Sequence, residues 1–177
     1  YFKGIGMLGD INPFEYIKYH YPDIKFLIRN HRFLIIEAIG EGVVINPLQH
    51  CAAVDCFVAF RPQLAREALF QCLLTAFENY GKPYDFLFNF ATDDALVCSE
   101  LVYKSFRKTV AKDGIEFQMG SLAGSAFLSP NDIAAKFCNQ KNNPSASMKL
   151  VLFYNGNSRF KTAREENQDE FCNLMNR

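Results

Sequence analysis

Apolar residues recur at spacings of three to five along the stretch after residue 95, which predicts a helix packed along one face. They are Leu96, Val97, Leu101, Val102, Phe106 and Val110. Thr92 is a candidate N-cap for this helix, and Asp93 and Asp94 would complement the positive end of its dipole. Cys98 then lies within the first turns of the predicted helix, on its apolar face.

The pattern before the cysteine helix predicts short strands and one long helix. Residues 24–28 and 33–36 are apolar runs separated by four polar residues, which predicts a hairpin of buried strands. Residues 43–45 and 55–60 predict two further strands, and these segments together predict one antiparallel sheet. Apolar positions at helical spacing over residues 63–80 predict a helix that packs on the sheet.

Shorter elements are expected on both sides of this region. Asn12 is a candidate cap, and Pro13 a first residue, for a short helix that ends near residue 19. Residues 112–125, rich in glycine and serine, predict a surface loop, and Ser129 caps a small predicted helix. Residues 148–154 predict a last strand.

The C-terminal segment differs in composition from the rest of the chain. Residues 155–177 are polar and charged with few apolar anchors, which predicts a loosely held helix or a disordered tail. A length of 177 residues favours one domain with a sizeable core. We therefore expect a single domain over residues 1–154 and a polar tail over residues 155–177.

Charge and hydropathy give no indication of a nucleic-acid or membrane partner. The net charge is zero and no run of like charge stands out, so nothing indicates binding to nucleic acid or to an anionic membrane. No apolar run approaches the ~20 residues needed to span a bilayer, and no signal peptide is recognisable from Tyr1 onward. We predict neither a nucleic-acid partner nor a transmembrane segment.

The cysteines leave the redox state open. They stand at positions 51, 56, 72, 98, 138 and 172. An even number permits disulfides in an oxidising compartment, but a chain of this size does not need a disulfide framework. Only Cys51 and Cys56, with His50, form a cluster, and this spacing lacks the paired C-x-x-C motifs of a zinc site.

Cys98 has two interpretations when its spacing alone is considered. A thiol near a helix N-terminus lies close to unpaired backbone N–H groups, which favour the nucleophilic thiolate. The alternative is that Cys98 is a small buried apolar residue, as most free cysteines are, and spacing alone favours this alternative.

Five short motifs then follow one another in a distinctive order. They are the strand end and glycine turn at residues 35–42, Asn46-Pro47-Leu48, Phe60-Arg61-Pro62, Gly81-Lys82-Pro83-Tyr84-Asp85-Phe86 and Cys98-Ser99-Glu100-Leu101-Val102. Together they resemble the circularly permuted papain-like amidases of the NlpC superfamily, and in particular the YiiX/YebB-like hydrolases. The resemblance covers roughly residues 8–110.

The resemblance implies an α+β fold in which an antiparallel sheet packs against a central cysteine-bearing helix. It also implies a Cys-His-polar catalytic triad, with Cys98 as the nucleophile and Glu37 as the residue that orients the histidine. Imidazole takes the thiol proton and later protonates the leaving amine, while a carboxylate fixes the tautomer of the ring. Taken alone, Glu37 is more often a solvated strand end than a catalytic group.

The histidine departs from the family pattern. The family position falls near Pro22, where this chain has no histidine, and His20 lies two residues earlier. Three explanations remain: the kink at Pro22 aims His20 at the site, a loop is missing from the sequence, or the protein is an inactive relative. We favour the first. His31 and His50 are better explained as surface histidines.

Two further motif residues have a structural alternative. Tyr84 matches the family's Tyr-Asp-Phe motif and would line the substrate site, although an aromatic residue beside Pro83 is equally a core residue. Glu100 follows Cys98 by two positions, so on a helix it points away from the thiol, and we expect a structural role.

We therefore predict a cysteine hydrolase that cleaves an amide bond through Cys98, His20 and Glu37, with Tyr84 in the substrate site. The family implies peptide substrates, including peptidoglycan-type peptides, and favours a periplasmic or secreted location. No metal or organic cofactor is expected. The alternatives are a catalytically inactive domain that binds a peptide or acyl ligand, and an acyltransferase with the same Cys-His machinery.

Overall fold

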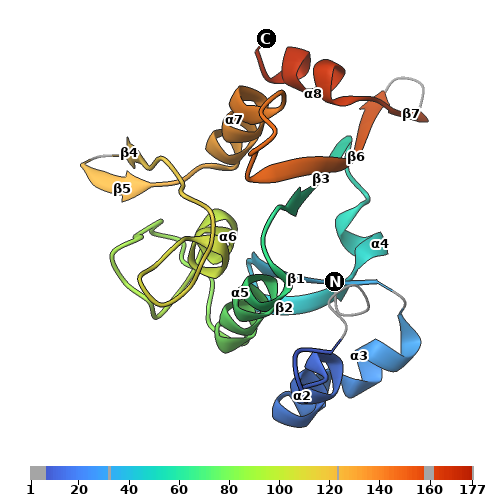
Figure 1. Cartoon of the computed structure of the whole chain (residues 1–177), viewed down its shortest axis with the longest axis vertical. Coiled ribbons are helices and arrows are strands. Elements are labelled where there is room, and N and C mark those ends of the chain that lie inside the picture. Colours follow the sequence, from blue (N-terminus) through green and yellow to red (C-terminus); the bar gives the residue numbers. More distant parts are fainter. Residues whose placement is uncertain (1–6, 32, 123, 158–161, 177) are drawn as a thin grey trace. The chain divides into compact units, whose positions relative to one another are not determined.

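The computed structural model describes residues 7–31, 33–122, 124–157 and 162–176 (Figure 1). The chain divides into two compact units, each built from two separate segments. The first unit comprises Tyr1–Cys51 and Leu64–Gly114, and the second comprises Ala52–Gln63 and Ile115–Arg177. The arrangement of one domain followed by a tail stays a prediction.

The elements of the first unit are α2 (Pro13–His20), η1 (Pro22–Ile24), α3 (Lys25–Asn30), β1 (Leu34–Ile39), β2 (Gly42–Pro47), α4 (Leu48–Cys51), α5 (Arg66–Glu78) and α6 (Cys98–Phe106). Those of the second unit are β3 (Cys56–Pro62), β4 (Gly120–Leu122), β5 (Ser125–Phe127), α7 (Pro130–Gln140), β6 (Met148–Asn157), β7 (Thr162–Glu165) and α8 (Gln168–Met175).

The N-terminal helix α2 forms as its sequence predicts. The Asn12 side chain accepts hydrogen bonds from the backbone N–H groups of Phe14 and Glu15, at 3.0 and 3.2 Å. Pro13 occupies the first helical position, where a residue without an N–H costs nothing. Ile17 points inward and is fully buried.

The predicted strand at residues 24–28 is wrong, because this run continues from η1 into α3. Ile24 is buried and Leu27 packs on the same core, whereas Phe26 is 73% exposed. That is the spacing of a helix face, and a short apolar run cannot be assigned by hydrophobicity alone. The second run joins a different hairpin, in which β1 pairs with β2.

The β1–β2 hairpin has one face in the core. Ala38 stands opposite Val43 in the register, and both are buried. Side chains alternate between the two faces of a strand, so Glu37 and its partner Val44 lie on the opposite face.

A glycine lets this hairpin approach the loop that follows α5. Gly42 has φ +110°, and a Cβ there would lie 2.5 Å from the Lys82 carbonyl oxygen. Next to it, the Val43 N–H donates to that same carbonyl at 2.8 Å. The backbone of the glycine turn therefore holds the start of the Lys82 loop.

Among the described residues of the first unit, two clusters of buried side chains lie in the core. One joins α2, η1, β2 and α5 through Ile17, Ile24, Ile45 and Phe77. The other joins the hairpin to α6 and the residues before it through Ala38, Val43, Leu96 and Leu101. The cysteine helix α6 thus packs against β1 and α5.

The second unit contains a sheet of order β3–β6–β7 and a separate β4–β5 hairpin. Among the described residues, the strands form three sheets rather than the single sheet predicted from the sequence. The β4–β5 hairpin occupies part of the predicted loop at residues 112–125. Its neighbour α7 begins as predicted, with Ser129 and Asp132 in a reciprocal capping box.

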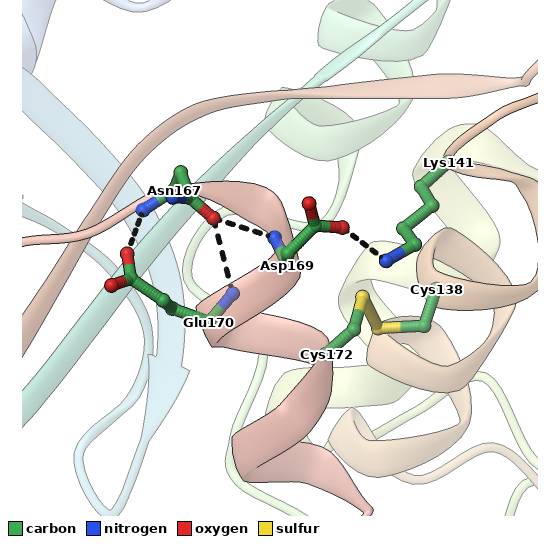
Figure 2. Close-up of a disulfide and its surroundings, with 6 residues drawn as sticks. All are labelled: Cys138, Lys141, Asn167, Asp169, Glu170 and Cys172. Atoms are coloured by element: carbon green, nitrogen blue, oxygen red, sulfur yellow. Dashed lines mark hydrogen bonds and ion pairs between the residues drawn. A yellow bond between two sulfur atoms is a disulfide. The ribbon is translucent and has the colours of Figure 1, made fainter.

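The C-terminal segment is more ordered than its composition suggests. β7 pairs with β6, and Phe171 of α8 is buried against the rings of Phe60 and Phe153. A disulfide between Cys138 and Cys172 joins α7 to α8, beside an ion pair between Lys141 and Asp169 (Figure 2). In the part of the chain that the structure describes, no helix is both long and apolar enough to cross a bilayer.

Candidate active site

Cys98 is the first residue of α6, so the helix begins six residues later than the predicted cap at Thr92. Val97 precedes it in an extended conformation and makes no side-chain capping bond. The first bond of the helix runs from the Leu101 N–H to the Val97 carbonyl, at 3.0 Å. The thiol therefore stands where backbone N–H groups are left unpaired by the helix.

Cys98 is exposed, and its predicted place on the buried face is wrong. The buried residues of α6 are Ser99, Glu100, Leu101 and Ser105. Val102 and Val110, which the apolar pattern placed on that face, are 36% and 111% exposed. A nucleophile must meet its substrate, so an exposed thiol at a helix start is better placed for attack than a buried one.

An extended backbone segment leads into the helix. Leu96 forms a parallel bridge with Tyr84. The Leu96 N–H donates to the Pro83 carbonyl at 3.0 Å, and the Asp85 N–H donates to the Leu96 carbonyl at 3.2 Å. The two most specific sequence motifs, around Tyr84 and around Cys98, thus run side by side.

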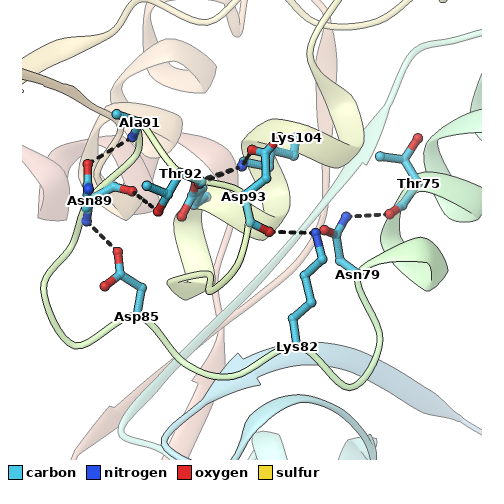
Figure 3. Close-up of polar contacts among 10 residues, drawn as sticks. Thr75, Asn79, Lys82, Asp85, Asn89, Ala91, Thr92, Asp93 and Lys104 are labelled. Carbon is cyan, nitrogen blue, oxygen red and sulfur yellow. Dashed lines mark hydrogen bonds and ion pairs between the residues drawn. The ribbon is translucent and has the colours of Figure 1, made fainter.

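Lysine side chains tie the loop before Cys98 in place (Figure 3). Lys82 Nζ donates to the Asp93 carbonyl at 2.7 Å. Lys104 Nζ, from α6, donates to the Thr92 carbonyl at 3.2 Å and also to the Asp93 carboxylate. Lys104 accordingly lowers the pKa of Asp93. Thr92 and Asp93 thus attach the loop to Lys104 in the middle of α6, and neither residue caps the helix.

Glu100 is a fully buried carboxylate two residues after the thiol. Lys104 Nζ forms an ion pair with Glu100 Oε1 at 3.0 Å. Burial raises the pKa of Glu100, although Lys104 opposes the rise. The sequence analysis missed Lys104, whose spacing of four from Glu100 was the available signal.

Tyr84 is half-buried and packs on the core cluster that joins the hairpin to α6. Burial raises the pKa of its phenol, and the neighbouring Cys98 and Asp85 raise that pKa further. Of the predicted site residues, Tyr84 is thus the one that the structure brings next to Cys98.

Glu37 has other partners among the described residues. Its Oε1 accepts hydrogen bonds from Asn46 Nδ2 at 2.8 Å and from Cys51 Sγ at 3.1 Å. The face that carries Glu37 is opposite the one through which Ala38 packs near α6.

The histidines lie on exposed or half-buried helix ends. His20 is exposed at the end of α2, where its ring centroid lies 4.2 Å from that of Tyr16 and 5.1 Å from that of Tyr19. His31 follows α3, and His50 is exposed on α4. No described contact joins any of the three rings to Cys98.

Histidine, cysteine and carboxylate side chains are also the usual ligands of metal ions in proteins. Within the described ranges, no group of three or more His, Cys, Asp or Glu side chains is arranged to hold a metal ion.

Comparison with known proteins gives one family and one solved structure. Residues 12–152 match the family described as "Permuted papain-like amidase enzyme, YaeF/YiiX, C92 family". The chain is also similar to the crystal structure of the metalloprotein YiiX from Escherichia coli O157:H7, with 24% identity and a TM-score of 0.42, over 76% of this chain and 74% of that chain. None of the curated proteins matches the chain. The family match confirms the resemblance and the α+β fold class drawn from the sequence motifs.

Proposed function

Since the chain belongs to the permuted papain-like amidases of the YaeF/YiiX C92 family, we propose that it hydrolyses an amide bond with Cys98 as the nucleophile. The observation that carries this proposal is the place of the thiol: Cys98 is exposed and is the first residue of α6. The family supplies the reaction class, and the helix start supplies a position in which a thiolate is stabilised.

In the proposed reaction, the Cys98 thiolate attacks the amide carbonyl and forms a tetrahedral oxyanion. Backbone N–H groups at the start of α6, that of Cys98 among them, donate hydrogen bonds to the oxyanion. The C–N bond then breaks, the amine leaves with a proton from the general acid, and a thioester remains on Cys98. Water attacks the thioester, gives up a proton to the same base and releases the carboxylic acid and the free thiol.

We propose His20 as the base and Glu37 as the residue that orients it. The resemblance of residues 35–42 to the family motif supports Glu37, and His20 is the histidine that lies nearest in sequence to the family position. Both residues belong to the first unit, as does Cys98. Because no described contact joins His20 to the Cys98 thiol, each of the three histidines should be replaced singly in the test of this proposal.

The inactive ligand-binding domain is the second candidate. The observation in its favour is the displaced histidine, since His20 stacks against Tyr16 at the far end of α2. Such a domain would bind a peptide or acyl ligand without an activated thiol.

The test is the rate at which iodoacetamide alkylates Cys98 between pH 4 and 9, read by mass spectrometry of the Cys98 peptide. We expect a thiolate that reacts near pH 6, and we expect His20→Ala to abolish this low-pH reactivity. His31→Ala and His50→Ala are matched controls. Hydrolysis of peptide amides, absent in Cys98→Ala, then establishes turnover.

Each outcome decides between the candidates. If only His31→Ala or only His50→Ala abolishes the low-pH alkylation of Cys98, that histidine is the base in place of His20, and the hydrolase proposal stands. Reactivity that begins only above about pH 8, and that ignores all three substitutions, would refute the hydrolase and leave the ligand-binding domain.

A further inference from the structure

Three large apolar side chains are exposed to solvent directly after Tyr84-Asp85. Phe86, Leu87 and Phe88 are 70%, 88% and 47% exposed. Single exposed apolar residues are ordinary on protein surfaces, but contiguous apolar patches mark binding sites. No charged residue interrupts the three, and Asp85, which precedes them, is buried.

The loop is held in a fixed shape that keeps these side chains outward. The Asp85 carboxylate accepts hydrogen bonds from the backbone N–H groups of Leu87, at 2.8 Å, and of Asn89. Phe88 has φ +55°, a conformation that is uncommon for an aromatic residue. A strained residue persists where the surroundings impose it, and such positions cluster at ligand sites.

The same loop is continuous with the surroundings of the nucleophile. The Tyr84 ring makes edge contacts with Phe86 and Phe88, at centroid distances of 5.0 and 6.5 Å. Tyr84 is bridged in parallel to Leu96, two residues before Cys98. The loop that carries Phe86 therefore begins beside the extended segment that leads into Cys98.

We propose that Phe86, Leu87 and Phe88, with Tyr84, form an apolar subsite that binds an aliphatic or aromatic group next to the scissile amide. The inference rests on the proposed function and specifies its substrate class: amides with an apolar group on one side of the reacting carbonyl. The occupant is the substrate, because the patch adjoins the nucleophile. Phe86 and Phe88 contact the Tyr84 ring, and Tyr84 is bridged to the segment that leads into Cys98.

The subsite is tested without hydrolysis by comparing N-octylmaleimide with N-ethylmaleimide as thiol reagents. Peptide mapping gives the ratio of the two rates at Cys98 and, in the same sample, at Cys56, an exposed thiol of the second unit. We expect the octyl-to-ethyl ratio at Cys98 to exceed that at Cys56 about 10-fold, which corresponds to burial of about two methylene groups.

Variants separate the subsite from general apolar surface. Phe86→Ser/Leu87→Ser is expected to bring the octyl-to-ethyl ratio at Cys98 down to that at Cys56. Val110→Ser, which removes a fully exposed valine beyond the other end of α6, is the matched control and should keep the preference.

Equal ratios at Cys98 and Cys56 in the wild type would overturn the proposal, and so would a preference that survives in the double variant. The octyl preference does not depend on turnover. If Cys98 prefers N-octylmaleimide but the protein does not hydrolyse octanoyl amides, the proposed hydrolase activity is refuted and the apolar subsite is supported. In an active enzyme, the double variant should raise KM for octanoyl amides about 10-fold more than KM for acetyl amides.

Discussion

Cys51 and Cys98 are free thiols of the same unit with different surroundings. Cys51 is half-buried and donates a hydrogen bond to the Glu37 carboxylate. Burial raises the pKa of the Cys51 thiol to about 11, and the bond to Glu37 contributes to the rise. A thiol with this pKa stays protonated at neutral pH and is a poor nucleophile.

Replacing the carboxylate should therefore activate Cys51. Glu37→Gln removes the negative charge beside the thiol, which lowers the pKa of Cys51 and should increase its alkylation at pH 8.5 on the order of 10-fold. Iodoacetamide labelling across pH 7–11, read by peptide mapping, measures this change. Cys56 in the same sample is the control, and an unchanged Cys51 profile would show that Glu37 does not hold its proton.

The sequence was informative about single residues where a motif fixed them. Cys98 and Tyr84 were predicted as site residues from short motifs, and the Tyr84–Leu96 bridge brings the two motifs side by side. The partners of Glu37 were not found, because Asn46 reaches it through the hairpin register and Cys51 through the short helix α4. Neither contact has a signature in local spacing.

Between elements, Lys104 pairs with the buried Glu100 within α6 and bonds Thr92 and Asp93 of the loop before the helix. Removing the Lys104 charge leaves the Glu100 carboxylate buried without a partner, so Lys104→Met should lower the free energy of unfolding by about 3 kcal/mol. Glu100→Gln should cost less, because Lys104 keeps its ion pair with Asp93. The double variant has no unpaired charge and should recover most of that loss. Urea unfolding measures all three variants.

The double variant also tests the tether to the loop. It lacks the bonds from Lys104 to Thr92 and Asp93, so amide exchange over residues 92–97 should stay about 10-fold faster than in the wild type. The exposed pair Glu15–Lys18 on α2 is the control, and its neutral variant should change stability by less than about 0.5 kcal/mol. Additive losses in the Glu100–Lys104 double variant would contradict the pairing.

The raised pKa of Glu100 also gives stability a pH dependence. The folded state holds the Glu100 proton to a higher pH than the unfolded chain, whose glutamates titrate near ~4.3. Folded molecules thus bind more protons above that pH, and this group lowers stability as pH rises. The stability of Glu100→Gln relative to wild type should therefore increase between pH 4.5 and 7. A constant difference in urea unfolding would contradict this.

Elements with capping signals were predicted better than elements with apolar runs alone. Asn12 and Ser129 began helices where expected, because their side chains bond the first N–H groups. The start of α6 was misplaced, because no side chain caps it and Thr92 offered a plausible alternative. α3 was mistaken for a strand for the same lack of a cap.

For the molecule as a whole, the disulfide between Cys138 and Cys172 closes the C-terminal part of the second unit. The two residues are 34 positions apart. A crosslink of this length restricts the unfolded chain and stabilises the fold by about 3–4 kcal/mol in the chain-entropy model.

Cys138→Ser/Cys172→Ser should lose that stability in urea unfolding monitored under non-reducing conditions. Cys56→Ser, which removes an exposed free thiol, is the control and should be neutral. Non-reducing digests should yield the crosslinked peptide. Two free thiols at these positions, together with an unaltered unfolding curve, would disprove the crosslink.

The whole-molecule arrangement was the least predictable from sequence. The resemblance supplied the α+β fold class, but local patterns could not show that β3 pairs with β6, far along the chain, and not with the β1–β2 hairpin. The composition of the C-terminal segment also predicted less order than the structure shows. Composition cannot indicate the disulfide to Cys172 or the burial of a single ring, that of Phe171.

The interleaving of the two units has a consequence for the newborn chain. β3 emerges from the ribosome long before β6, and the contact between Cys56 and Asn155 spans 99 positions. At about 5–20 residues per second, the strand waits on the order of 5–20 s with its edges unpaired. An unpaired strand edge is a template for other chains. Translation that pauses between the two strands should therefore favour aggregation, so synthesis speed and chaperone access become determinants of yield.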